Sequence, residues 1–365
     1  MKFSAEFVFP GHPDKLCDAA VDSLVSAAQT LEKRSFCAIE AAVHRNHVFL
    51  TGRLACRDVE KIGIPDLVRS VFASAGYGRP WDPDPGDLRV HTELCLGPLQ
   101  ENESEMRARS DDQAIVTGFA VDLPATNFLP VEHWLALRLS RALESLRTDQ
   151  PGLQLGPDGK LLVVYDQDQR RLAAFNASLQ QASGASEIDL TRQVRQRVQQ
   201  ELECCRALLP DLEPALPEVF VVNGGGSFHV GGPEADNGLS GKKLVVDAYG
   251  PRAPIGGGAL SGKDFYKPDR AGALLARRLA KAVVLSGAAK ECRAALTIFP
   301  GEREFRIVSV VNEDGRPLDA VRWGSLIDLR LEAAGDAWGG AADPVCLARY
   351  GHFTEPGFPW EQIRF

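Results

Sequence analysis

Apolar residues recur every three or four positions in several segments, which is the spacing of helices with one buried face. The clearest segment follows Pro13, and its apolar positions are Leu16, Ala20, Leu24, Ala28 and Leu31. Proline suits the first turn of a helix, because the amide it lacks would have no partner there. The same spacing predicts helices over residues 58–77, 131–147, 186–205 and 269–286. The last of these carries Arg277, Arg278 and Lys281 on the side opposite its alanines and leucines.

Short runs rich in β-branched and aromatic residues predict strands between these helices. Residues 35–43 and 47–56 flank Arg45-Asn46 and predict a hairpin, and residues 294–299 and 305–311 predict a second one. Further strands are predicted over residues 111–122, 161–165, 172–179 and 218–222, with a turn at residues 157–160. Residues 97–110 are polar and uneven, which is typical of a mobile loop. This alternation of helices and hairpins predicts three α+β units.

Length and composition fit a large globular protein. A chain of 365 residues with 44% hydrophobic content buries about three quarters of its unfolded surface and forms two or three subdomains. Its net charge of −8 disfavours a nucleic-acid partner, which needs a basic face. No segment resembles a signal peptide or a membrane span. The cysteines show no metal-binding spacing, so we expect free thiols and a cytoplasmic protein.

Residues 227–270 alternate glycines with basic and acidic side chains. Glycines let backbone amides approach phosphates, lysines neutralise them, and carboxylates hold magnesium against them. Lys242, Lys243, Lys263 and Lys267 therefore favour a polyphosphate site over the alternative, a purely structural crossover. A P-loop is excluded, because Asp264 follows Lys263 where a serine or threonine should bind magnesium.

Three further residues are candidates for chemistry. His12 and Asp14 lie at the start of the first predicted helix, where unpaired amides and the positive end of the dipole favour phosphate. Helix capping alone is the alternative for both residues. Glu40 falls in the middle of a predicted strand, where a buried carboxylate needs a partner or an ion. Arg53 is one candidate partner, and an exposed hairpin face is the other interpretation.

Four motifs resemble the S-adenosylmethionine synthetase (methionine adenosyltransferase) family. They are GHPDK at residues 11–15, GGPEADNGLSGKKLVVDAYG at 231–250, GGGALSGKDFYKPDR at 256–270 and YGHF at 350–353. The resemblance runs from about residue 4 to residue 361. It implies an α+β fold of three similar subdomains related by pseudo-threefold symmetry, with sheets packed at a dimer interface. The expected boundaries are 1–98, 105–222 and 223–365, with the subdomains interleaved in space.

The resemblance also implies an activity. Enzymes of this family transfer the adenosyl group of ATP to the sulfur of methionine and release phosphate and diphosphate. The implied cofactors are two Mg²⁺ ions at each site, and K⁺ is compatible with the family. The implied partners are ATP, a thioether amino acid and a second copy of the chain, in a homodimer or a tetramer. Neither nucleic acid nor a membrane is an expected partner.

The resemblance assigns roles residue by residue. The triphosphate contacts, expected to be catalytic, are His12, Lys160, Lys242, Lys243, Lys263 and Lys267. Asp158 and Phe228 match the nucleoside site, and Asp236 matches the carboxylate that receives the methionine amino group. Asp14 and Asp269 match magnesium ligands, and Glu40 matches a carboxylate associated with potassium. Asp112 and Gln113 match the gate beside the substrate site.

Departures from the family concentrate around the amino acid substrate. Arg53 stands where the family has a glutamate beside the methionine amino group, and Ser227 stands where an arginine is usual. Arg53 could pair internally with Asp236 or Glu40, or it could select a thioether that has a carboxylate instead of the amino group. The alternatives to S-adenosylmethionine synthesis are therefore transfer to another thioether, a weakly active or regulatory homologue, and a triphosphatase.

Overall fold

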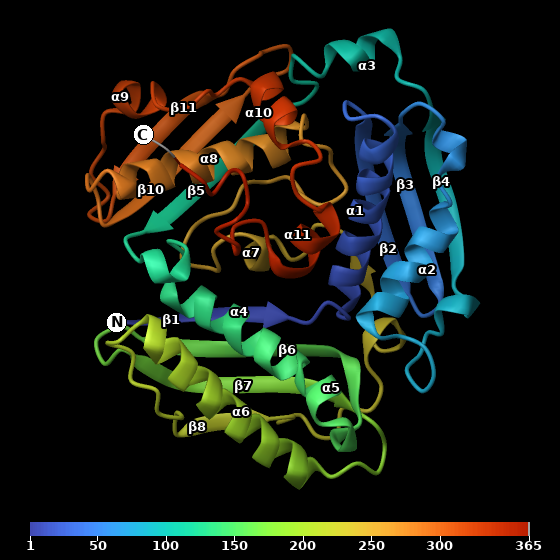
Figure 1. Ribbon diagram of the computed structural model, residues 1–365, viewed down its shortest axis with the longest axis vertical. Coiled ribbons are helices and arrows are strands. Elements are labelled where there is room, and N and C mark those ends of the chain that lie inside the picture. The colour runs from blue at the N-terminus through green and yellow to red at the C-terminus, as the bar shows by residue number, and fades with distance from the viewer. Residues whose placement is uncertain (364–365) are drawn as a thin grey trace.

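The computed structural model describes residues 1–363, in which helices pack on one face of each of three β-sheets (Figure 1). The predicted mixed α+β class is confirmed. Each sheet has its own core cluster of buried apolar residues. Among residues 1–363, no helix is both long and apolar enough to cross a membrane.

The first sheet has the strand order β4-β3-β2-β9. Its strands are β2 (Phe36–His44), β3 (His47–Ala55), β4 (Arg89–Gly97) and β9 (Gly238–Leu239). The predicted hairpin is confirmed as β2 and β3, and β4, which was not predicted, runs parallel to β3. Helices α1 (Pro13–Leu31) and α2 (Ile64–Ala75) bury their apolar stripes on this sheet (Figure 1).

The second sheet has the strand order β1-β6-β7-β8. Its strands are β1 (Lys2–Val8), β6 (Leu155–Asp166), β7 (Arg171–Gln181) and β8 (Val219–Val222), and its helices are α4 (Val131–Glu144), α5 (Leu146–Asp149) and α6 (Glu187–Leu208). The predicted turn at residues 157–160 is wrong, because these residues lie inside β6. The β6–β7 register shifts between Leu155 and Gly159, and such an irregularity accommodates Pro157, which has no amide to donate.

The third sheet has the strand order β11-β10-β5. Its strands are β5 (Ala114–Val121), β10 (Glu291–Ile298) and β11 (Arg306–Asn312), and α8 (Pro268–Leu285) packs on it (Figure 1). The second predicted hairpin is confirmed as β10 and β11. Three short helices that were not predicted follow β11: α9 (Ala320–Gly324), α10 (Leu331–Trp338) and α11 (Pro344–Tyr350).

The predicted mobile loop at residues 97–110 contains a short helix, α3 (Glu101–Glu105). A reciprocal capping box starts it: the Gln100 side chain accepts the backbone amide of Glu103, and the Glu103 side chain accepts the backbone amide of Gln100. Arg107 then enters the core, with 1% of its surface exposed, and donates to the Asp264 carboxylate at 2.7 Å. The segment is therefore anchored at two points.

All three sheets combine distant parts of the chain, and in the first sheet β2 pairs with β9. Strand β1 pairs with β6, and β5 pairs with β10. The predicted subdomain boundaries remain a prediction, but a cut at residue 98 or 222 would separate strands that share a sheet. The polar side of α8 is also not a solvent face, since Arg277 is fully buried and Lys281 is only 4% exposed.

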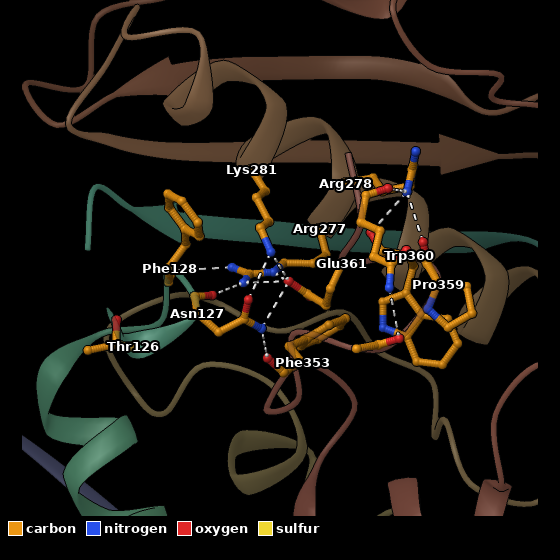
Figure 2. A network of polar contacts seen from close by, with 12 residues as sticks. Thr126, Asn127, Phe128, Arg277, Arg278, Lys281, Phe353, Pro359, Trp360 and Glu361 are labelled. Carbon is orange, nitrogen blue, oxygen red and sulfur yellow. Dashed lines mark hydrogen bonds and ion pairs between the residues drawn. The ribbon is translucent and has the colours of Figure 1, made fainter. Parts of the chain in front are cut away.

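Arg277 and Lys281 hold the carboxyl-terminal segment in place (Figure 2). The Glu361 carboxylate accepts from Arg277 Nε at 2.9 Å and from Lys281 Nζ at 2.7 Å. Arg277 also donates to the carbonyls of Phe119 at 2.6 Å and Asn127 at 2.5 Å. Because all three charged side chains are buried, this network ties α8, the end of β5 and the turn at Glu361 together.

Candidate polyphosphate site

The start of α1 lies beside the ends of two neighbouring strands. Val8, the last residue of β1, pairs with Lys160 in β6, and the chain then turns through Gly11 into α1. A Cβ on Gly11 would lie 2.2 Å from the Pro157 carbonyl oxygen, so only glycine permits this approach. The fold thereby brings His12 next to Lys160, although they are far apart in the sequence.

His12 is neutral at physiological pH. Burial lowers its pKa to about 4, with further lowering by the nearby positive charge of Lys243. Its Nδ1 accepts from the Asp14 amide at 3.2 Å, so the single ring proton is on Nε2. The ring therefore caps α1 through one nitrogen and has an N–H to offer an anion through the other.

Asp14 lies between two lysines of the glycine-rich segment. Its Oδ2 is 2.9 Å from Lys243 Nζ and its Oδ1 is 3.9 Å from Lys242 Nζ. Oδ1 also accepts the Leu239 amide at 3.0 Å. We call His12, Asp14, Lys160, Lys242 and Lys243 the helix α1 cluster.

The predicted nucleoside residues adjoin this cluster. Asp158 accepts the Gly232 amide at 2.7 Å, and burial raises its pKa to about 6. Burial dominates the pKa of both His12 and Asp158, and the negative charge of Asp236 is near enough to favour the protonated form of each. Phe228 is on the same loop, and a Cβ on Gly231 would lie 3.0 Å from its ring.

A second group of charges surrounds the start of α8. Lys263 Nζ donates to Asp269 at 2.5 Å, and Lys267 pairs with Asp111 and lies 4.0 Å from the centre of the Phe36 ring. We call Lys263, Lys267, Asp269 and Asp111 the helix α8 cluster. Asp111 was missed from the sequence, although it immediately precedes the predicted Asp112. Its Oδ1 is buried without a hydrogen-bond partner.

Strand β2 runs past both clusters. Ser240 exchanges backbone and side-chain hydrogen bonds with Ala41, while Lys263 forms an isolated bridge with Ala38. Three residues along a strand span about 10 Å, so the two lysine segments lie side by side at that spacing. Within residues 1–363, no hydrogen bond or ion pair joins the two clusters directly.

The remaining predicted residues are exposed. Glu40 lies on the outward face of β2, and its carboxylate accepts from Ser240 Oγ at 2.5 Å. Of the two readings of Glu40, the exposed face is therefore confirmed. Asp112 and Gln113 are exposed just before β5, where the Asp112 carboxylate accepts the Gln113 amide at 2.8 Å.

Arg53 pairs with a carboxylate that the sequence did not suggest. Its Nε and Nη2 donate to Glu103 in α3 at 2.7 and 2.8 Å, and Nη2 also donates to the Pro98 carbonyl at 2.9 Å. The expected partners, Asp236 and Glu40, are therefore wrong, whereas an internal ion pair is confirmed. The hydrogen bond from Arg53 keeps the pKa of Glu103 below its usual value, so the pair is fully charged at neutral pH.

Asp14 and Asp269 offer magnesium the oxygen ligands that it prefers, and the small number of carboxylates is also suitable. Mg²⁺ is usually bound by one or two carboxylates together with substrate phosphates, not by a cage of protein ligands. Asp14 and Asp269 each stand among lysines, and residues 1–363 contain no group of three or more side chains able to hold a metal. The arrangement therefore fits an ion that arrives with a polyphosphate.

A cavity of about 610 Å³ lies away from both clusters, between the second and third sheets. None of the predicted site residues lines it. Its buried carboxylate, Glu132, is 3.8 Å from Arg252, which also pairs with Glu291. Burial raises the pKa of Glu132, and neither of its carboxylate oxygens has a hydrogen-bond partner within the described residues.

Comparison with known proteins gives full-length matches. Family models for S-adenosylmethionine synthetase match in three parts, the N-terminal domain over residues 1–92, the central domain over 107–228 and the C-terminal domain over 230–316. The S-adenosylmethionine synthase of Corynebacterium kroppenstedtii is 32% identical over 99% of this chain and 96% of its own length. Those of Petrotoga mobilis and Thermus thermophilus are 30% and 31% identical, over 100% and 98% of this chain and 96% and 95% of their own lengths.

Proposed function

The chain belongs to the S-adenosylmethionine synthetase family, and we propose that its two lysine clusters bind the triphosphate of ATP. It is an enzyme, a methionine adenosyltransferase that forms S-adenosylmethionine from ATP and methionine. One observation carries the assignment of the site: Lys242 and Lys243 lie against Asp14 at the start of α1, where His12 caps the helix.

The chemistry explains why lysines dominate the site. A lone pair of the methionine sulfur attacks C5′ of ATP, the C5′–O bond breaks, and its electrons leave with the triphosphate. The thioether has no proton to lose, so a general base is unnecessary. The protein contributes by orienting the reactants and by stabilising the negative charge that develops on the leaving oxygen.

We propose the residue roles that the family resemblance implies. His12, Lys160, Lys242, Lys243, Lys263 and Lys267 contact the triphosphate. Asp158 and Phe228 hold the nucleoside, with the aromatic face stacked on adenine. Asp236 receives the methionine amino group, and Asp112 and Gln113 line the entrance to the substrate. The released triphosphate is then hydrolysed to phosphate and diphosphate.

Asp14 and Asp269 would hold magnesium, two ions at each site, and Glu40 is the residue proposed for potassium. Bound magnesium would neutralise charge on the triphosphate and so make it a better leaving group. In the free chain, Lys243 and Lys263 neutralise the two aspartates. Nucleotide binding would redirect these lysines from the aspartates to the phosphates.

Asp269→Asn should raise the magnesium concentration needed for half-maximal activity at least tenfold, because an amide is a weaker ligand for a hard cation. Titration of activity with magnesium at saturating ATP measures the effect. Asp319→Asn is the control, since Asp319 also lies at a helix start, capping α9, but is remote from both clusters. Asp269→Asn with an unchanged magnesium curve, or native activity that survives excess chelator, would refute the metal assignment.

A homodimer is the proposed assembly, with pairing into tetramers left to experiment. Helices cover only one face of each sheet (Figure 1), and large apolar side chains are exposed on strands of all three sheets. They are Phe49 (46%), Leu96 (45%), Ile115 (69%), Leu162 (41%), Val219 (57%) and Val308 (62%). Exposed apolar surface of this extent marks an interaction site, and sedimentation velocity of the purified chain tests it.

Arg53 no longer supports an altered thioether substrate, because its guanidinium is occupied by Glu103. We expect native protein to use methionine better than a des-amino analogue. Arg53→Glu should destabilise the segment around α3 and should not improve the KM for methionine, since two carboxylates would then face each other. The measurements are steady-state kinetics and thermal unfolding.

The matched control is the charge-swapped pair, Arg53→Glu with Glu103→Arg, which restores an ion pair. It should recover part of the lost thermal stability, because the ion pair is restored while Glu103→Arg removes the capping box at the start of α3. A native enzyme that prefers the des-amino substrate, or an Arg53→Glu variant with improved methionine affinity, would revive the altered-substrate hypothesis.

One assay tests the function itself. Incubation with ATP and magnesium, with and without methionine, should yield S-adenosylmethionine and phosphate only when methionine is present. Phosphate release without methionine and without adenosyl product would indicate a triphosphatase, and neither product would indicate a regulatory homologue. The cytoplasm remains the proposed compartment, in keeping with cysteines that are all free thiols.

A further inference from the structure

Helix α1 carries three aspartates at intervals of four residues, Asp14, Asp18 and Asp22. Residues spaced by four lie above one another on the same helix face. All three are buried, with exposed fractions of 1%, 0% and 0%. A row of buried carboxylates is costly unless each one has donors, so the partners of these side chains matter.

Each aspartate accepts a backbone amide from the glycine-rich segment. Asp14 accepts from Leu239 at 3.0 Å, Asp18 from Gly241 at 2.8 Å and Asp22 from Gly262 at 2.9 Å. The last two donors immediately precede Lys242 and Lys263. Helix α1 thus holds the backbone amides of Gly241 and Gly262, which precede Lys242 in one cluster and Lys263 in the other.

The two glycines adopt backbone conformations that other residues rarely adopt. Gly241 has φ +72° and Gly262 has φ +83°, both in the left-handed region. A Cβ on Gly262 would lie 2.1 Å from the Ile39 carbonyl oxygen. The amide direction at these glycines, and with it the direction in which the next lysine leaves the backbone, depends on the acceptor that holds it.

Further charges fix the two aspartates. Asp22 forms a bidentate pair with Arg270 at 2.8 and 2.9 Å, and Arg270 Nη1 also donates to the Lys263 carbonyl at 2.8 Å. Asp18 lies 3.4 Å from Lys15, which pairs in addition with Asp247. Asp22 and Arg270 therefore hold Lys263 on both sides, through the amide before it and through its own carbonyl.

We propose that Asp18 and Asp22 are positioning residues, which aim Lys242, Lys243 and Lys263 at the triphosphate by holding the backbone amides of Gly241 and Gly262. This inference rests on the proposed function of the lysine clusters. Neither aspartate reaches the substrate, because both are fully buried beneath the segment that they hold. They affect the leaving group only indirectly, by positioning the lysines.

Asp18 offers the cleaner test, because Lys15 keeps Asp247 as a partner when Asp18 is changed. Asp18→Asn retains an oxygen acceptor for Gly241, and Asp18→Ala removes it. We expect Asp18→Ala to lower kcat about 10²-fold, the cost of misplacing reactive groups by about 1 Å. The KM for methionine should stay within about twofold, and Asp18→Asn should keep kcat within about tenfold of native, since its acceptor remains.

Magnesium tripolyphosphate is the probe that separates positioning from adenosyl transfer. Calorimetry should show binding at least tenfold weaker for Asp18→Ala than for Asp18→Asn. Asp166→Ala and Asp166→Asn are matched controls, because Asp166 is also buried and accepts the Asp168 amide at 3.0 Å in a remote hairpin. Both controls should bind the probe like native protein. If native protein makes no S-adenosylmethionine, the proposed function fails, whereas the probe still tests the positioning.

Two results would overturn the proposal. One is an equal effect of Asp18→Ala and Asp18→Asn on kcat and on tripolyphosphate binding, because the hydrogen-bond acceptor would then be irrelevant. The other needs no variant and applies even if Asp18→Ala does not fold. Hydrogen exchange of native protein should show slow amides at Gly241 and Gly262, and exchange as fast as at exposed loop amides would show that the aspartates do not hold them.

Discussion

Lys263→Ala should lower the turnover number about 10²- to 10³-fold, the usual loss when one preorganised group that stabilises transition-state charge is removed. Lys263 is the residue of the α8 cluster whose backbone is held on both sides and whose side chain lies against the proposed magnesium ligand Asp269. Its charge should act mainly on the departing triphosphate, so kcat should fall more than the affinity for methionine. Steady-state and single-turnover kinetics measure both.

The same substitution should lower the free energy of unfolding by about 1–3 kcal/mol, because it leaves the largely buried Asp269 carboxylate without its charged partner. Lys61→Ala is the matched control, since Lys61 pairs with Asp58 at 2.9 Å on the surface and far from either cluster. It should leave turnover unchanged. Lys263→Arg should recover part of the activity by keeping the charge. An unchanged turnover number for Lys263→Ala would remove Lys263 from the catalytic site.

Glu361→Ala should lower the free energy of unfolding by about 3–5 kcal/mol, the cost of breaking a buried ion pair by removing one partner. Arg277 and Lys281 would remain buried, with only neutral partners for two positive charges. The burial that already lowers the pKa of Lys281 would then act without the opposing charge of Glu361. Urea unfolding followed by circular dichroism gives the difference.

Glu355→Ala is the control for this effect, because Glu355 pairs with Arg141 at 2.7 Å near the same end of the chain but is 39% exposed. Its expected cost is about 1 kcal/mol or less. If Glu361→Ala proves too unstable to purify, Glu361→Gln keeps the size of the side chain and one acceptor oxygen, and it removes the charge and the hydrogen bonds that the second oxygen accepts. Equal destabilisation by Glu355→Ala and Glu361→Ala would show that the buried network stabilises the protein no more than an exposed ion pair does.

The sequence alone determined the features that depend on local interactions. Helix α1 was predictable because its apolar spacing and Pro13 act within a few turns of the chain. Lys242 and Lys263 could be predicted as phosphate ligands because glycines and aspartates surround them within one segment. The hairpin of β2 and β3 was predictable for the same reason, since its strands are joined by a tight turn.

The tertiary structure alone decided the partners of the buried charges. Arg53 meets Glu103, and Lys267 meets Asp111, across 50 and 156 residues of sequence. Arg277 and Lys281 lie in a core although their positions on α8 suggested a polar face, because Glu361 arrives there from the end of the chain. Periodicity shows only which face of a helix is polar, and it does not show whether that face meets water or a distant carboxylate.

The same reason explains why Asp18 and Asp22 were overlooked. In the sequence they are ordinary polar residues of an amphipathic helix. Their importance arises from amides that lie 223 and 240 residues away, and no local pattern encodes such a distance. The residue types of the proposed site could therefore be predicted from the sequence. The way the backbone holds the lysines could not, because it depends on long-range hydrogen bonds that exist only in the folded molecule.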